Sequence, residues 1–188
     1  AGTIVSIDGE EAVIDYGVHH SLSELTDRTL PDMARVMEAG VTSFKVFTAY
    51  PGRMMLDDGA IFKILRRAKE IGALICVHAE NGAVIDVLIH DALAAGHVAP
   101  KYHPLTRPAA AEREAVQRVI ALAEMADAPV YFAHVSSGGA IEQITQARLR
   151  GLPVYAETCP QYLVLSAELY DGIEFEGAKY VMSPPLRE

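Results

Sequence analysis

Residues 41–50 read VTSFKVFTAY, a run of β-branched and aromatic residues that a Pro-Gly pair closes. Such a composition, bounded by turn residues, predicts a buried β-strand. Because side chains alternate along a strand, Ser43, Lys45 and Phe47 are expected to share one face. Lys45 is out of place in such a strand, since a buried ammonium must lose its charge, find a partner or be chemically modified. The alternative is an edge strand from which Lys45 reaches solvent along its aliphatic stem.

This strand belongs to a series in which predicted strands and helices alternate along the chain. The predicted strands cover residues 12–18, 41–50, 73–78, 130–134 and 154–158, with a short extended piece at 179–183. The predicted helices cover residues 27–39, 57–72, 83–95, 108–126 and 137–151, and a polar loop is expected at 96–106. Alternation of this kind predicts a parallel α/β fold, either an open doubly wound sheet or a (β/α)8 barrel.

Polar residues mark where several of these helices should begin. Thr26 or Asp27 can cap the first helix, and Asp57 and Asp58 are expected to open the second. Ser136 or Ser137 can cap the helix that follows the strand at 130–134. Each of these side chains can accept a hydrogen bond from a free N–H group of the first helical turn.

Composition excludes several classes of function. The net charge of −9 argues against non-specific binding to nucleic acid or to anionic membranes. No apolar run approaches the roughly 20 residues of a membrane span, and neither glycine-rich nucleotide-binding motif is present. Cys76 and Cys159 are interpreted as reduced, buried thiols of a cytosolic protein. The chain starts at Ala1 without an initiator methionine, and we expect it to be a piece of a longer protein.

Lys45, His78 and His134 occupy equivalent positions in three predicted strand–helix units. Each lies in a strand or at its C-terminal end, where parallel α/β folds place their active sites. Neutral imidazoles are good zinc ligands, so two of them beside a misplaced lysine indicate a metal site. A lone histidine that ends a strand is more often structural, and the residues alone leave both interpretations open.

Lysine chemistry offers an explanation for the position of Lys45. An ammonium cannot bind a cation, but a deprotonated lysine amine can take up carbon dioxide and become an anionic carbamate. The two carbamate oxygens can bridge two metal ions, which activate a shared water and polarise a carbonyl group. His19 and His20 are not expected to bind one metal, because neighbours on a strand face opposite ways. Cys159 is not favoured as a nucleophile, because a metal-activated water needs no thiol.

The segments SFKVFTAY, VHAENG, HVSS, YAETCPQYL and KYVMSPPLRE together resemble the D-hydantoinase/dihydropyrimidinase family of the amidohydrolase superfamily. Each segment alone is a weak signal, but the combination is specific and runs over nearly the whole chain. The resemblance implies that Lys45 is a carboxylated lysine bridging two zinc ions, and that His78 and His134 bind one of them. It also implies that Tyr50 stabilises a tetrahedral oxyanion. The backbone of Ser183 would bind the amide and imide groups of a ring substrate.

Without the resemblance, the residues themselves favour plainer interpretations of two of these sites. Tyr50 would be a turn residue beside Pro51, and Ser183 a turn or cap residue before Pro184. The functional interpretation of both therefore depends on the family.

The resemblance further implies that residues 1–188 are an incomplete (β/α)8 TIM barrel, comprising about strands 3 to 7. The first and last strands of the barrel and the β-sandwich domain of the family would be missing. The family's HxH pair, its metal-binding aspartate and a substrate-binding asparagine have no counterpart in this sequence. The isolated chain is therefore expected to be inactive and to have open sheet edges.

The implied activity is metal-dependent hydrolysis of a cyclic amide by a hydroxide that bridges two zinc ions. A dihydropyrimidine or a 5-substituted hydantoin would be opened to an N-carbamoyl amino acid. The alternatives are an allantoinase-like cyclic amidohydrolase and a catalytically silent scaffolding relative, and the presence of Lys45, His78 and His134 argues against the second. We expect a cytoplasmic homo-oligomer, a tetramer by resemblance, that acts on a small molecule and binds neither nucleic acid nor membrane.

Overall fold

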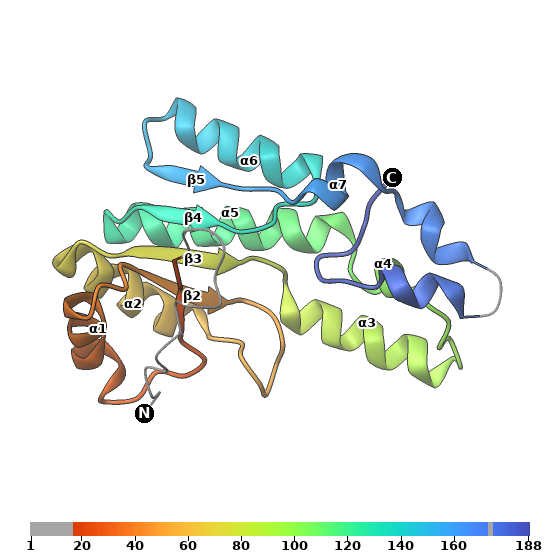
Figure 1. Ribbon diagram of the computed structural model, residues 1–188, viewed down its shortest axis with the longest axis horizontal. Helices are drawn as coiled ribbons and strands as arrows, with labels where there is room; N and C mark the ends of the chain where they lie inside the picture. Colours follow the sequence, from red (N-terminus) through yellow and green to blue (C-terminus); the bar gives the residue numbers. More distant parts are fainter. Residues whose placement is uncertain (1–16, 173–174) are drawn as a thin grey trace, which may run out of the picture.

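The computed structural model describes residues 17–172 and 175–188. Most of the strand predicted at 12–18 lies outside these residues. Within them, five parallel strands form one sheet whose spatial order follows the sequence (Figure 1). The strands are β1 (His20–Ser21), β2 (Ser43–Phe47), β3 (Leu74–His78), β4 (Val130–Phe132) and β5 (Val154–Ala156). The predicted parallel α/β fold is therefore confirmed.

Four helices connect successive strands, as parallel neighbours require. Each helix packs against the next one along the chain, so the four form a single layer. They are α1 (Thr29–Glu38), α2 (Asp58–Ile71), α5 (Ala109–Ala126) and α6 (Gly138–Leu149).

The hydrophobic core lies between this helical layer and one face of the sheet. Phe44 and Val46 of β2 are fully buried in it, together with Ile75 and Val77 of β3. The intervening residues of the same strands belong to the opposite face, and Lys45 of that face is only half-buried. The predicted alternation of β2 is thus confirmed. The lysine lies on the face that the helical layer does not cover.

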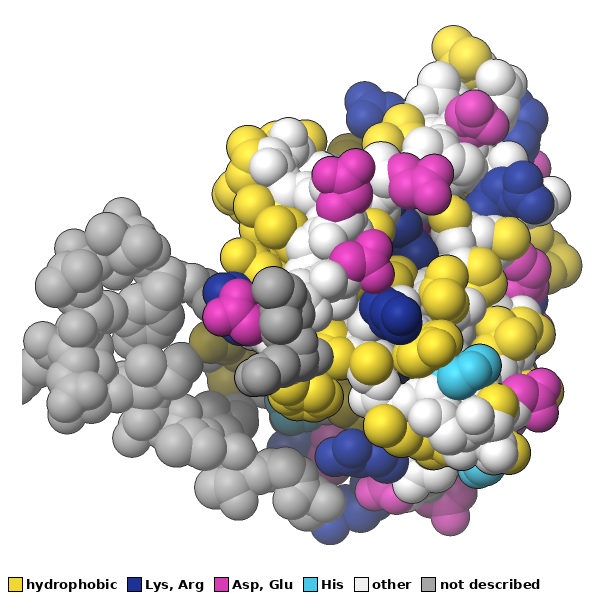
Figure 2. Space-filling view, turned by 90° about the vertical axis from the view of Figure 1, so that its right-hand side faces the viewer, with side chains coloured by type: hydrophobic (Ala, Val, Ile, Leu, Met, Phe, Trp, Pro, Cys, Tyr) yellow, Lys and Arg dark blue, Asp and Glu magenta, His cyan; other side chains and the backbone are white. Residues whose placement is uncertain are grey.

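The remaining helices lie beyond the C-terminal ends of the strands (Figure 1). They are α3 (Gly82–Ala94), α4 (Tyr102–Leu105), α7 (Pro160–Val164) and the 3-10 helices η1 (Ala167–Asp171) and η2 (Glu176–Tyr180). Figure 2 views the molecule from this end and shows hydrophobic side chains spread between charged ones over the described surface. Among the described residues, no helix is both long and apolar enough to cross a membrane.

Most predicted helix caps are confirmed, and one is wrong. The Asp57 carboxylate accepts a hydrogen bond from the backbone N–H of Ala60 at 2.7 Å, and Ser137 caps α6. The residue preceding α1 is Arg28, which makes no side-chain cap. The hydroxyl of Thr26 hydrogen-bonds with the hydroxyl of Thr29 and not with a backbone N–H of the first turn.

Two other expectations are corrected by the structure. The loop predicted at 96–106 contains the short helix α4. The extended piece predicted at 179–183 instead begins in η2, because the N–H of Val181 bonds back to the carbonyl of Ala178. That segment pairs with none of the described strands.

The two cysteines are free thiols, as predicted. Cys76 is buried in β3 beside Lys45, its partner in the strand register. Cys159 precedes α7 and is only partly buried, so its predicted burial is confirmed in part.

Candidate active site

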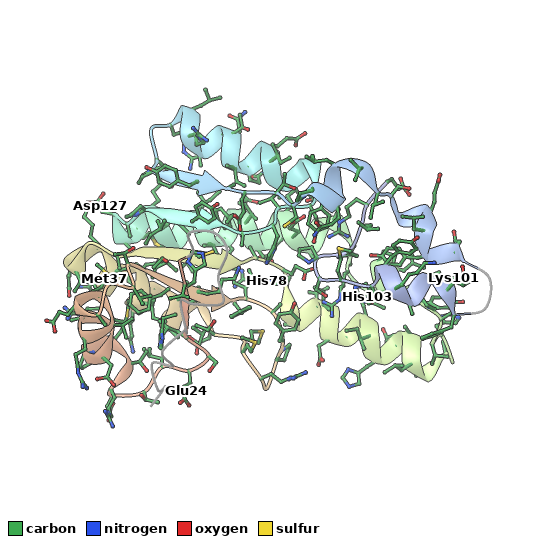
Figure 3. All side chains as sticks on the ribbon, in the orientation of Figure 1. Glu24, Met37, His78, Lys101, His103 and Asp127 are labelled. Atoms are coloured by element: carbon green, nitrogen blue, oxygen red, sulfur yellow. The ribbon has the colours of Figure 1, made fainter. Side chains whose placement is uncertain are left out.

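Lys45 lies in the middle of β2, His78 ends β3 and His134 follows β4, so the three come from neighbouring strands of the sheet. Figure 3 labels His78, at the end of β3. The Nδ1 atom of His78 lies 3.2 Å from the Nε2 atom of His134. The Nζ atom of Lys45 lies 3.5 Å from the same Nε2 atom. The structure therefore brings the three residues together, although they are far apart in the sequence. β2 pairs with strands on both sides, which rules out the edge-strand interpretation of Lys45.

The spacing of the two imidazoles fits a shared metal ion. Two nitrogen ligands at the usual zinc distance and a tetrahedral angle lie about 3.3 Å apart. The nitrogen atoms of His78 and His134 have this separation, and Nδ1 of His134 is buried without a hydrogen-bond partner among the described residues. No group of three His, Cys, Asp or Glu side chains in this part of the chain could hold a metal. The two histidines are therefore at most part of a ligand set here.

Electrostatics keeps His134 neutral. Burial, and secondarily the closeness of His78 and Lys45, lowers the pKa of His134 to about 4. At neutral pH its imidazole carries a lone pair, which is the form that binds a metal.

Glu80 is the most buried charged group of the site, with no exposed surface. Its carboxylate accepts a hydrogen bond of 2.9 Å from Nε2 of His78. Burial alone would raise the pKa of Glu80, but the hydrogen bond from His78 and the charges of Arg107 and Arg187 outweigh it and lower the pKa. Glu80 is therefore an ionised carboxylate behind the histidine pair.

Tyr50 and Ser183 lie at the same site. The ring of Tyr50 lies 5.0 Å from that of His78, and its hydroxyl lies beside the side chain of Ser183. Burial, and secondarily the charge of Glu80, raises the pKa of Tyr50, so the phenol keeps its proton at neutral pH. All five residues that the sequence singled out are therefore gathered in one region.

Three aromatic side chains fix the segment that carries Ser183. His103 donates from Nε2 to the carbonyl of Met182 at 2.6 Å. The Tyr162 hydroxyl donates to the carbonyl of Pro184 at 2.6 Å, and the N–H of Leu186 donates to the Tyr170 hydroxyl. Ser183 is thus held from both sides, although it lies in an irregular part of the chain.

A second buried carboxylate, Glu112, ties this segment to the loop after β4. It accepts hydrogen bonds from the N–H and the hydroxyl of Ser136, at 2.8 and 3.0 Å. Arg187 donates to the same hydroxyl and to the carbonyl of Arg107. No pattern in the sequence indicated this network, which joins segments remote in the chain.

Glu80 was not predicted from the sequence as a residue of the site, although its spacing from His78 indicated a contact. Residues two apart in a strand face the same side, so the spacing His78-Ala79-Glu80 at a strand end could have suggested the contact. His19 and His20 behave as expected, because they contact different residues. His19 hydrogen-bonds with Ser43, whereas His20 packs edge-on against Phe44.

The chain is similar to several known proteins, although no protein-family model matches it. The D-hydantoinase of Geobacillus stearothermophilus is 53% identical over 179 residues, which are 95% of this chain and 38% of that protein. The D-hydantoinase of Streptomyces coelicolor is 52% identical over 174 residues, 93% of this chain and 37% of that protein.

Solved structures agree with the sequence comparison. The dihydropyrimidinase from Brevibacillus agri superposes with a TM-score of 0.92 and is 53% identical. The match covers 94% of this chain and 39% of that structure. Identity at this level, with the same fold over nearly every residue compared, is the mark of common ancestry. The chain is homologous to the D-hydantoinases and dihydropyrimidinases, and it spans about 38% of the length of these relatives.

Proposed function

We propose that the full-length protein hydrolyses a cyclic amide, opening a dihydropyrimidine or a 5-substituted hydantoin ring to an N-carbamoyl amino acid. The homology to D-hydantoinases covers 95% of this chain. The observation that carries the proposal is the 3.2 Å separation of the His78 and His134 nitrogens beside Lys45. The activity is proposed for the full-length protein, because this chain spans about 38% of its relatives.

The proposed architecture of the full-length protein is a (β/α)8 barrel, of which these strands would be about strands 3 to 7. A doubly wound sheet reverses its strand order at a switch point and carries helices on both faces. The described strands follow one another without reversal, and the connecting helices form one layer. Both features favour the barrel over the doubly wound alternative.

The metal site would hold two zinc ions, with a carboxylated Lys45 between them and the pair His78 and His134 on one of them. Carboxylation requires the neutral amine, which forms a new N–C bond to carbon dioxide and releases a proton. When bound, the two ions supply a Lewis acid and an acidified water able to attack a carbonyl at neutral pH.

The protein's own residues bind the substrate and stabilise charge. The Tyr50 hydroxyl, which keeps its proton, would donate a hydrogen bond to the oxyanion that forms when the ring carbonyl becomes tetrahedral. The backbone of Ser183 would bind the amide and imide groups of the ring and so orient the ring carbonyl in the site. An allantoinase-like reaction uses the same chemistry on another ring, and the substrate range distinguishes the two.

The test is the metal content and turnover of the full-length protein and its Lys45→Ala variant. We expect about two zinc ions per subunit in the wild type, hydrolysis of dihydropyrimidines or hydantoins, and loss of both properties in the variant. Lys63→Ala, which removes an exposed lysine of α2, is the control and should change neither. A wild type without metal would favour a silent scaffolding relative, and normal turnover of Lys45→Ala would remove Lys45 from the site.

A further inference from the structure

The two ring nitrogens of His78 have different partners. Nε2 faces the Glu80 carboxylate at 2.9 Å, and Nδ1 faces His134 at 3.2 Å. The side chains of both His78 and Glu80 are almost completely buried, at 3% and 0% exposure. Water therefore cannot readily replace the contact between His78 and Glu80.

The contact with Glu80 decides where His78 carries its proton. A carboxylate oxygen at this distance from a ring nitrogen takes the acceptor role, so the Nε2 atom of His78 is the donor in this contact. A neutral imidazole has a single N–H, which leaves a lone pair on Nδ1. That lone pair points at the position between His78 and His134 that the proposed zinc ion would occupy.

Glu80 is itself held in place by neighbouring groups. The hydroxyl of Thr48 donates to the backbone carbonyl of Glu80 at 2.8 Å. Arg107 lies 3.8 Å from the carboxylate oxygen that His78 contacts. The second carboxylate oxygen is buried without a hydrogen-bond partner among the described residues. A buried carboxylate in this incompletely bonded state is costly, and a buried charged group of this kind is weak evidence for a role in stability alone.

We propose that Glu80 is a positioning residue that fixes the tautomer and the ring orientation of His78 for metal binding. The inference rests on the proposed function, because it requires that His78 binds a metal. The carboxylate touches neither metal nor substrate and acts through the imidazole. Carboxylate–histidine pairs of this kind also make the ligand nitrogen more basic, and their loss costs about 10–100-fold in metal affinity.

Zinc titration of the metal-free, full-length protein against a chromophoric chelator tests the proposal. In Glu80→Ala we expect the dissociation constant of one zinc ion to rise about 10–100-fold, while that of the other stays at the wild-type value. The asymmetry follows because His78 would bind only one of the two ions. A purely structural defect would weaken both ions together.

Two further variants make the result decisive. Glu80→Gln keeps the size of the side chain and an oxygen that can accept from His78, so the same constant should rise less. Glu124→Gln alters a carboxylate of α5 that pairs with Arg150 and not with a histidine, and both zinc constants should stay unchanged. If Glu80→Ala fails to fold, Glu80→Gln decides.

The outcomes separate this inference from the proposed function. A wild type that binds two zinc ions, with Glu80→Ala and Glu80→Gln unchanged in both constants, overturns the role of Glu80 alone. Equal weakening of both ions assigns Glu80 a structural role and also overturns the inference. A wild type that binds no zinc overturns the proposed function and this inference with it.

Discussion

Tyr50 and His134 have left-handed backbone conformations, with φ of 69° and 42°, although neither residue is a glycine. Such conformations cost on the order of 1 to 3 kcal/mol and persist only where neighbouring contacts enforce them. At Tyr50 the enforcing contacts are visible, because its carbonyl accepts hydrogen bonds from the N–H groups of three following residues, 53–55. The strained backbone directs the tyrosine ring to within 5.0 Å of the His78 ring. Backbone strain at both positions is typical of a functional site, in which a required side-chain position is kept at a cost in stability.

The Tyr50→Phe variant tests the role of the Tyr50 hydroxyl separately from that of the aromatic ring. The substitution keeps the ring and its backbone conformation and removes only the proposed oxyanion donor. We expect kcat of the full-length protein to fall by about 10²–10³-fold, with its zinc content unchanged. Steady-state kinetics and metal analysis measure the two quantities. Tyr102→Phe is the control, because that ring stacks on His97 in the loop before α4, and a wild-type kcat in Tyr50→Phe would contradict the assignment.

The sequence allowed some of the site residues to be predicted, but not all of them. Lys45, His78 and His134 could be predicted because each lies in or just beyond a strand, and parallel strands bring such positions to one end of a sheet. Tyr50 and Ser183 came only from the resemblance, since neither has a pattern that distinguishes it from a turn residue. Glu80 was missed because its importance depends on which nitrogen of the His78 ring it meets, and a sequence does not show ring orientation.

At the level of elements, α3 is packed directly against the chain that leaves β2. The N–H of Gly82, the first residue of α3, donates to the carbonyl of Thr48 at 3.1 Å. A Cβ atom at Gly82 would lie 2.6 Å from the Cα of Ala49 and 2.9 Å from the carbonyl oxygen of Thr48. Both are backbone atoms and cannot rotate away. The absence of a side chain at Gly82 therefore sets the distance between α3 and the segment that carries Tyr50.

Gly82→Ala should consequently displace the Tyr50 segment. We expect the full-length protein to lose about 1–3 kcal/mol of stability from the overpacking, and kcat to fall because Tyr50 moves. Thermal unfolding and steady-state kinetics measure the two effects. Gly138→Ala is the matched control, because Gly138 also begins a helix but an added Cβ would have no neighbour within 4 Å. That variant should be as stable as the wild type or more stable, and equal behaviour of the two variants would refute the argument.

Elements with strong hydrophobic periodicity were predicted well, and the failures have local causes. α2 begins after Asp57 and ends before Gly72, as its capping residues indicated. The short helix α4 was missed because its four residues contain no hydrophobic period. The tail at 179–183 was predicted as extended from its β-forming residues, but a strand requires a partner. Side-chain hydrogen bonds from His103 and Tyr162 fix this tail instead.

At the level of the whole molecule, the sheet has an unpaired edge at β5 among the described strands. β5 pairs with β4 and with no other described strand. A groove of about 550 Å³ runs along α6 and β5, and apolar residues of both elements line it. Ile141 and Leu149 of α6 are 54% and 76% exposed there, and Tyr155 of β5, which lies outside the groove, is 49% exposed. An unpaired strand beside exposed apolar side chains is a template for association with another chain.

We therefore expect residues 1–188, expressed alone, to self-associate and to show no hydrolase activity. The physical reason is that the β5 edge and its groove, which another strand–helix unit would cover in the proposed barrel, are exposed to solvent in this chain. Light scattering after size-exclusion chromatography measures the association, and the full-length protein at the same concentration should form a discrete species. A monodisperse monomer of the isolated chain would show that this edge does not drive association.

A charge placed in the groove should locate the associating surface. Leu149→Lys puts an ammonium beside the exposed β5 edge, where charged residues oppose strand addition, and it should reduce self-association of the isolated chain. Met125→Lys changes an apolar residue of α5 that is similarly exposed, at 66%, but lies outside the groove. It should leave the association unchanged. If both lysines reduce association equally, the cause is net charge and not the β5 edge, and the unfinished sheet would no longer explain the behaviour of the chain.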